Sequence, residues 1–106
     1  MHKILHRVNT KADLENTPSQ YGVEVDIRSY GKDLIIHHDP FEKGEFFESW
    51  IKSYHHGTLI LNVKEEGLEE RLLKLMKFYS IENFFFLINL FLFYVRLLLM
   101  EKVVVR

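Results

Sequence analysis

The chain has 106 residues and no cysteine, and its 14 basic and 15 acidic side chains give a net charge of −1. The absence of cysteine excludes a disulfide framework, a thiolate metal site and a cysteine nucleophile. The balanced charge offers no basic surface for nucleic acid, so we expect no nucleic-acid partner. A complete eight-stranded α/β barrel needs about 200–250 residues, so this chain alone cannot form one.

The first half of the chain predicts three strands and a short helix. Residues 3–8 are a short strand, and Thr10 with Asp13 three positions later is a weak capping signal for one or two helical turns. Residues 22–28 alternate strictly between apolar and polar side chains, which is typical of a strand. After a turn, residues 34–37 form the next short strand.

The second half predicts two helices and two buried strands. A loop followed by a helix is expected over 41–54, and the β-branched, apolar residues 58–63 indicate a buried strand. Apolar side chains recur at helical spacing over 68–79, and 81–88 form another apolar strand. Because strands and helices alternate, we expect an α/β fold with parallel pairing and βαβ crossovers.

Polar residues that can carry chemistry lie at or near the ends of the predicted strands. They are His6, Arg7, Glu24, Asp26, His38, Asn62 and Lys64. Sites in parallel α/β folds form where strands end, so we expect these side chains to meet. Two carboxylates two residues apart on a strand can share Mg²⁺ or Ca²⁺. Two histidines can act as acid and base on a phosphate ester, while arginine or lysine stabilises the phosphoryl charge.

Each feature taken singly also has a purely structural interpretation. A carboxylate pair on a strand is most often a solvated face, and a histidine at a strand end is most often a surface side chain. His55 and His56 are interpreted as a loop pair, and the Phe84 to Phe86 run as core. The order of the features along the chain is what argues for a site.

That order resembles the glycerophosphodiester phosphodiesterase family, one of the barrel phosphodiesterases, a group that includes phosphatidylinositol-specific phospholipase C. The residues that carry the resemblance are ILHR at 4–7 and GVEVDIRSYGKDLIIHHD at 22–39. The resemblance covers about residues 3–88. It implies a partial (β/α)₈ barrel, roughly its first four to five strands with flanking helices. Residues 1–106 would then be one partial phosphodiesterase-like domain, with the motifs in 1–88 and a degenerate or truncated apolar tail over 89–106.

By this resemblance the chain is a metal-dependent hydrolase of small phosphodiesters, active in lipid metabolism. His6 and His38 match the acid–base pair, and Arg7 and Lys64 match the phosphate contacts. The positions that match the ligands of a divalent cation, Mg²⁺ or Ca²⁺, are Glu24, Asp26 and Asn62.

Two positions depart from the family's pattern. Val8 stands where a glycine usually follows the His-Arg pair, and Asn62 stands where a third carboxylate is expected. An amide oxygen can bind Mg²⁺ or Ca²⁺ but brings no charge, so the affinity for the cation would fall unless another acid substitutes.

Two other functions stay open. One is a non-catalytic half barrel that self-associates or pairs with a partner supplying the missing half, since open sheet edges invite pairing. The other is a membrane anchor over 84–100, which Asn89 and Arg96 argue against because a central arginine is costly in a bilayer. No signal peptide is evident at the start of the sequence, and the lack of cysteine fits a reducing compartment, so we expect a cytoplasmic protein.

Overall fold

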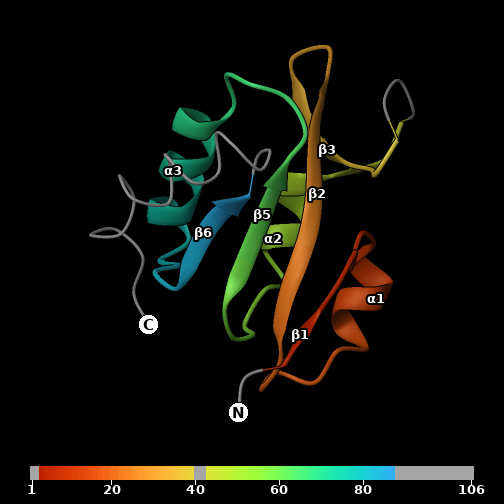
Figure 1. Ribbon diagram of the computed structural model, residues 1–106, viewed down its shortest axis with the longest axis vertical. Helices are drawn as coiled ribbons and strands as arrows, with labels where there is room; N and C mark the ends of the chain where they lie inside the picture. Colours follow the sequence, from red (N-terminus) through yellow and green to blue (C-terminus); the bar gives the residue numbers. More distant parts are fainter. Residues whose placement is uncertain (1–2, 40–42, 88–106) are drawn as a thin grey trace.

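The computed structural model describes residues 3–39 and 43–87, which form a mixed α/β fold around one six-stranded sheet (Figure 1). The main path of the sheet has the order β4-β3-β2-β5-β6, and β1 pairs with β2 off this path. In chain order the elements are β1 (Ile4–Leu5), α1 (Lys11–Glu15), β2 (Gly22–Tyr30), β3 (Asp33–Ile36), β4 (Glu45–Phe46), α2 (Phe47–Ile51), β5 (Leu59–Val63), α3 (Glu69–Phe78) and β6 (Phe84–Leu87).

The strand β2 is the centre of the sheet and has neighbours on both sides. On one side it pairs in parallel with β5, which pairs in parallel with β6. On the other side it pairs in parallel with β1 through Gly22 and Val23, and antiparallel with β3 over 27–30. The strands β1 and β3 therefore run toward each other along the same side of β2. Their ends approach each other beside Glu24 and Asp26.

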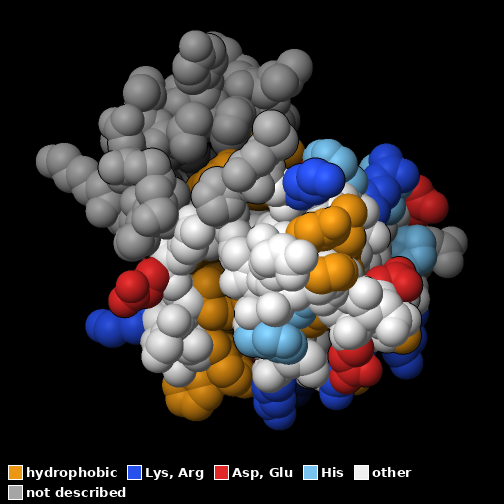
Figure 2. Space-filling model, turned by 90° about the horizontal axis from the view of Figure 1, so that it is seen from below, with side chains coloured by type: hydrophobic (Ala, Val, Ile, Leu, Met, Phe, Trp, Pro, Cys, Tyr) orange, Lys and Arg blue, Asp and Glu red, His pale blue; other side chains and the backbone are white. Residues whose placement is uncertain are grey.

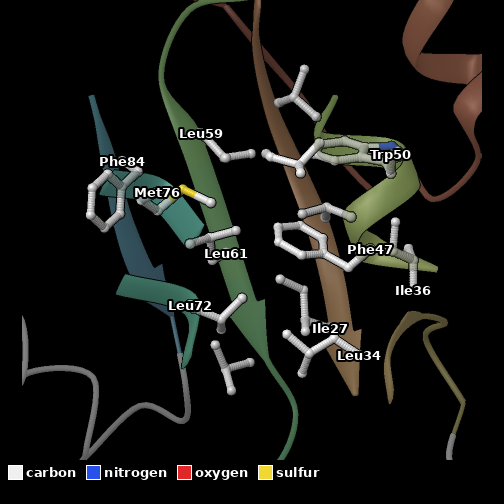
Figure 3. Close-up of a cluster of buried hydrophobic side chains, with 14 of the residues drawn as sticks. Ile27, Leu34, Ile36, Phe47, Trp50, Leu59, Leu61, Leu72, Met76 and Phe84 are labelled. Atoms are coloured by element: carbon white, nitrogen blue, oxygen red, sulfur yellow. The ribbon is translucent and has the colours of Figure 1, made fainter. Parts of the chain in front are cut away.

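The hydrophobic core lies on the face of the sheet that α2 and α3 cover (Figure 3). Alternate residues of β2 and β5 point to this face, because successive side chains of a strand point to opposite sides. The helices contribute Trp50 and Phe47 from α2 and Leu72 and Met76 from α3. The largest fully buried side chains of the core include Trp50, Phe47, Leu14, Ile27, Ile36, Ile51, Leu59, Leu61, Leu72 and Met76. Burying a side chain of this size contributes about 1.5–3 kcal/mol.

The helix ends use local hydrogen bonds that satisfy free backbone groups. At the start of α1, the Thr10 hydroxyl accepts a hydrogen bond from the Asp13 N–H at 3.0 Å, which confirms the predicted cap. At the end of α3, the Ile81 N–H donates to the Met76 carbonyl at 2.8 Å, and the Ser80 N–H donates to Lys77. This is the Schellman arrangement, and it places Ser80 at a φ of 58°.

The element predictions are mostly confirmed, with three differences. The strands 22–28 and 58–63 and the helix 68–79 correspond to β2, β5 and α3. The expectation of parallel pairing fails for β3, which forms an antiparallel hairpin with β2. The two-residue strand β4 was missed, and β1 has only two of the six residues expected, because such short pairings depend on neighbouring strands rather than on a sequence period.

The alternative of a membrane anchor over 84–100 falls largely outside the described residues, which end at 87, and the tail over 89–106 lies wholly outside them. Within 3–39 and 43–87, no helix has the length and apolar character needed to cross a bilayer.

Candidate functional site

The site forms where β1 and β3 approach each other beside the middle of β2. The chain leaving β1 is fixed to β2 by the Val8 N–H, which donates to the Glu24 carbonyl at 2.9 Å. The chain leaving β3 is fixed by the His37 N–H, which donates to the Asp26 carbonyl at 3.2 Å. The two segments arrive from opposite directions, and each carries one of the two histidines predicted to act as acid and base.

Glu24 connects the first histidine to the neighbouring strand β5. Its Oε1 lies 2.9 Å from His6 Nδ1, and the Asn62 side-chain amide donates to its Oε2 at 3.3 Å. The carboxylate is buried, whereas the side chain of His6 is 77% exposed. A carboxylate at Nδ1 favours a proton on that nitrogen, so Nε2 is the ring nitrogen that a ligand can reach.

Asp26 is the most enclosed charged residue of the site, with only 1% of its surface exposed. The Asn9 side-chain amide donates to Oδ2 at 2.9 Å, and His38 Nδ1 lies 3.6 Å from the same oxygen. Lys64 Nζ lies 3.4 Å from Oδ1 and forms an ion pair with it, but among the described residues this buried oxygen has no hydrogen bond. A buried carboxylate is costly unless it is paired, and here the amide and the ammonium group compensate.

The second histidine is held by two arginines. Arg28 donates two hydrogen bonds to the His38 carbonyl, from Nη2 at 2.7 Å and from Nε at 3.2 Å. Arg7 Nη2 lies 3.2 Å from His38 Nε2. Because a guanidinium group can only donate, Nε2 is the acceptor, and the ring proton of neutral His38 sits on Nδ1, toward Asp26.

Arg7 reaches this position from an unusual backbone conformation. Its φ is 54°, in the left-handed region that L-residues with a Cβ rarely adopt. Such strain is found where the surrounding contacts hold a residue in place, often at functional sites. Here the conformation turns the chain after β1 and brings the exposed guanidinium to the histidine that follows β3.

All seven predicted site residues therefore meet along β2 and β5, in two adjacent groups. One group contains His6, Glu24 and Asn62; the other contains Arg7, Asp26, His38 and Lys64. The sequence reasoning missed Asn9 and Arg28. In the sequence, Asn9 precedes the helix cap and looks like an ordinary loop residue. Its contact with Asp26 spans 17 positions, so no local pattern in the sequence indicates it.

The donor atoms fit a hard divalent cation in part. Rotation of the Asn62 side-chain amide by half a turn exchanges its nitrogen and its oxygen. After that rotation, Glu24, Asp26 and Asn62 would offer only oxygen ligands, which Mg²⁺ and Ca²⁺ prefer. The buried Asp26 Oδ1 lacks a hydrogen bond but is paired with Lys64 Nζ, so a cation bound here would displace that ammonium group. Within the described ranges, no three His, Cys, Asp or Glu side chains form a group able to hold a metal. A cation here would depend on the amide and on water for its remaining ligands.

A hollow of about 430 Å³ lies beside the second histidine. Its lining includes Asn9, Thr10, His38, Lys43 and Glu45. Part of the His38 side chain is open on this side, since 40% of it is exposed. On the face seen in Figure 2, basic, acidic and histidine side chains are interspersed among the described atoms.

One titratable group away from these residues has a shifted pKa. Burial raises the pKa of the Tyr54 phenol above its ordinary value, and its hydroxyl donates a hydrogen bond to the Gly57 carbonyl. Tyr54 therefore stays neutral in the physiological range and acts as a structural side chain.

Comparison with known proteins gives no neighbour for this chain: no protein-family model, no curated protein and no solved structure matches it.

Proposed function

We propose that the chain is a metal-dependent phosphodiester hydrolase of the glycerophosphodiester phosphodiesterase type, built on part of a (β/α)₈ barrel. The observation that carries the proposal is the meeting of two histidines, two carboxylates and two cationic side chains beside the middle of β2. The parallel strands β1, β2, β5 and β6, with helices between them, support the barrel assignment. The hairpin β3–β4 would then be an insertion within the unit that follows β2.

The cation would be held by Glu24, Asp26 and Asn62. When bound, it would supply positive charge that polarises the phosphoryl oxygens and stabilises the charge that develops on them. Glu24 can serve it through Oε2 while Oε1 keeps its contact with His6 Nδ1. The carboxylate would thus orient a histidine and hold the cation at the same time.

Proton transfer would be carried by the two histidines. One deprotonates the attacking water or hydroxyl, and the other protonates the leaving alcohol. His6 offers a solvent-facing Nε2. His38 Nε2 is covered by Arg7 in the substrate-free arrangement, so a bound phosphate that draws the guanidinium toward its oxygens would release this nitrogen for proton transfer.

Lys64 would balance the charge of the buried carboxylate and add positive charge to the substrate side. Its Nζ lies 3.4 Å from Asp26, and the side chain remains 21% exposed. An ammonium group in this position can contact a phosphoryl oxygen without leaving Asp26 unpaired.

The proposal is tested by diester hydrolysis with the purified chain. Glycerophosphocholine and bis(4-nitrophenyl) phosphate are offered with Mg²⁺ or Ca²⁺, and we expect turnover that a chelator abolishes. The double variant Glu24→Gln/Asp26→Asn should lose this activity, while Glu70→Gln, an exposed carboxylate of α3, should keep it. Absence of turnover in the wild-type chain, or turnover that survives the double substitution, contradicts the proposal.

A second candidate is association through the sheet edge at β6. In the described residues β6 pairs only with β5, which leaves one side of its backbone without a strand partner. An apolar hollow of about 600 Å³ lies next to it, lined in part by Leu73, Met76, Ile81 and Phe84. Both features favour a half barrel that pairs with a second copy or with a partner chain.

Light scattering after size-exclusion chromatography distinguishes this candidate. Association predicts a mass that rises with protein concentration toward a dimer. A constant monomer mass across the accessible range, with a sharp unfolding transition, would rule it out.

A further inference from the structure

We infer that Asn9 is a positioning residue, which fixes the orientation of the Asp26 carboxylate and thereby the oxygen that this carboxylate offers to a cation. The inference rests on the proposed function, since it concerns the cation of that site. Asn9 is not among the residues that carry the resemblance, and the proposed function gives it no part. It would act through Asp26 without touching the reacting atoms.

Both polar atoms of the Asn9 side chain form hydrogen bonds with the same residue, Asp26. Its Nδ2 donates to Asp26 Oδ2 at 2.9 Å, and its Oδ1 accepts from the Asp26 backbone N–H at 3.0 Å. One amide group therefore fixes both the main chain of β2 at this position and the rotation of the carboxylate. Asp26 is 1% exposed, so bulk water cannot readily take over these two bonds.

The result is a difference between the two carboxylate oxygens. Oδ2 is occupied by the Asn9 amide, whereas the buried Oδ1 has no hydrogen bond and faces Lys64 Nζ at 3.4 Å. Asp26 stands opposite Asn62 in the register of β2 and β5. Fixing Oδ2 therefore leaves Oδ1 for a cation shared with the neighbouring strand, which would displace the Lys64 ammonium group from its ion pair with this oxygen.

The same contact ties the catalytic loop to the carboxylates. Val8 donates to the Glu24 carbonyl and Asn9 binds Asp26, so the loop that carries His6 is fixed to β2 at both carboxylate positions. A change at Asn9 would release the loop and the carboxylate together. Residues that orient a metal ligand in this way alter affinity or activity by about 10–100-fold when they are removed.

The test measures binding of Mg²⁺ and Ca²⁺ by titration calorimetry, together with diester hydrolysis. We expect Asn9→Ala to bind the cation 10–100-fold more weakly than the wild-type chain, as an outer-shell partner does. In hydrolysis at saturating cation, kcat should fall while the KM for the diester changes little, because both polar atoms of the Asn9 side chain are engaged by Asp26. Asn9→Ser, whose short hydroxyl cannot make both bonds, provides a second variant in case the alanine variant does not fold.

Thr10→Ala is the matched control. Thr10 is adjacent to Asn9 and caps α1, so its loss destabilises the same loop, but no hydrogen bond joins it to Asp26 among the described contacts. We expect this variant to melt earlier and still bind the cation with wild-type affinity. A folded Asn9 variant with wild-type affinity, or an equal loss of affinity in Thr10→Ala, overturns the inference and leaves the proposed function standing. A wild-type chain that binds neither cation overturns both.

Discussion

The two faces of β2 are both buried, but by different physical means. Val23, Val25 and Ile27 point to the helix-covered face and are fully buried in apolar packing. Glu24 and Asp26, which alternate with them, are 8% and 1% exposed and are held by specific hydrogen bonds and ion pairs. An apolar core tolerates side-chain substitutions that keep its volume, whereas a buried charged network loses stability when any one hydrogen-bonding partner is removed. We therefore expect the first face to govern stability and the second to govern chemistry.

The largest effect is expected on the apolar face, from Trp50→Ala. Trp50 is fully buried and stacks between Phe47 and Tyr54, with ring centroids 5.8 and 5.7 Å away. Removing such a side chain costs about 3–5 kcal/mol of unfolding free energy. Urea denaturation followed by circular dichroism measures the loss. Phe46→Ala is the control, because Phe46 is 51% exposed and its truncation should change stability by less than about 0.5 kcal/mol.

On the polar face, Asp26→Ala should be costly in a different way. It leaves the Asn9 amide and Lys64 without their partner, and an unsatisfied buried polar group costs about 1–3 kcal/mol. It should also remove cation binding, which the Trp50 change should spare in the fraction that remains folded. Denaturation and calorimetry on the same samples separate the two effects. Asp33, an exposed carboxylate at the start of β3, provides the control. If Asp33→Ala lowers the unfolding free energy and the cation affinity as much as Asp26→Ala does, burial of the carboxylate is not the cause of the effect.

The sequence predicted the apolar face better than the polar one, for a physical reason. Alternation over 22–28 and helical spacing over 68–79 are local periods, and they located β2 and α3 within two residues at each end. The seven site residues were named because each lies near the end of a predicted strand. The contact of Asn9 with Asp26, and the antiparallel return of β3, depend on residues far apart in the chain. No local period encodes such a contact.

A smaller change in stability is expected at the end of α3, a helix that covers the apolar face of β2. Ser80 occupies the left-handed position of the Schellman motif with a φ of 58°, where glycine is the preferred residue. Relief of the Cβ strain exceeds the entropy cost of glycine in the unfolded chain, so Ser80→Gly should stabilise the fold by about 0.5–1 kcal/mol. Thermal unfolding measures the gain. A melting temperature below that of the wild-type chain would contradict this reading of the helix end.

The smallest stability effect is expected at Arg7, the corresponding left-handed position on the polar side. Arg7→Gly gains the same strain relief as the serine change but loses the contact with His38 Nε2, so its net effect should stay within about 0.5 kcal/mol of zero. Arg7→Ala loses the contact and keeps the strain, and it should therefore be the less stable of the two.

The two Arg7 variants should differ in stability but respond alike in function, because both lack the guanidinium group. We expect inorganic phosphate to bind more weakly to each of them, by a similar factor, whatever their stability. If Arg7→Gly keeps wild-type phosphate affinity, Arg7 serves only to turn the chain after β1. If the glycine variant is less stable than the alanine variant, the contacts around the loop favour the left-handed conformation without strain. Stability and ligand affinity should thus separate at Arg7, as we expect them to separate between the two faces of β2.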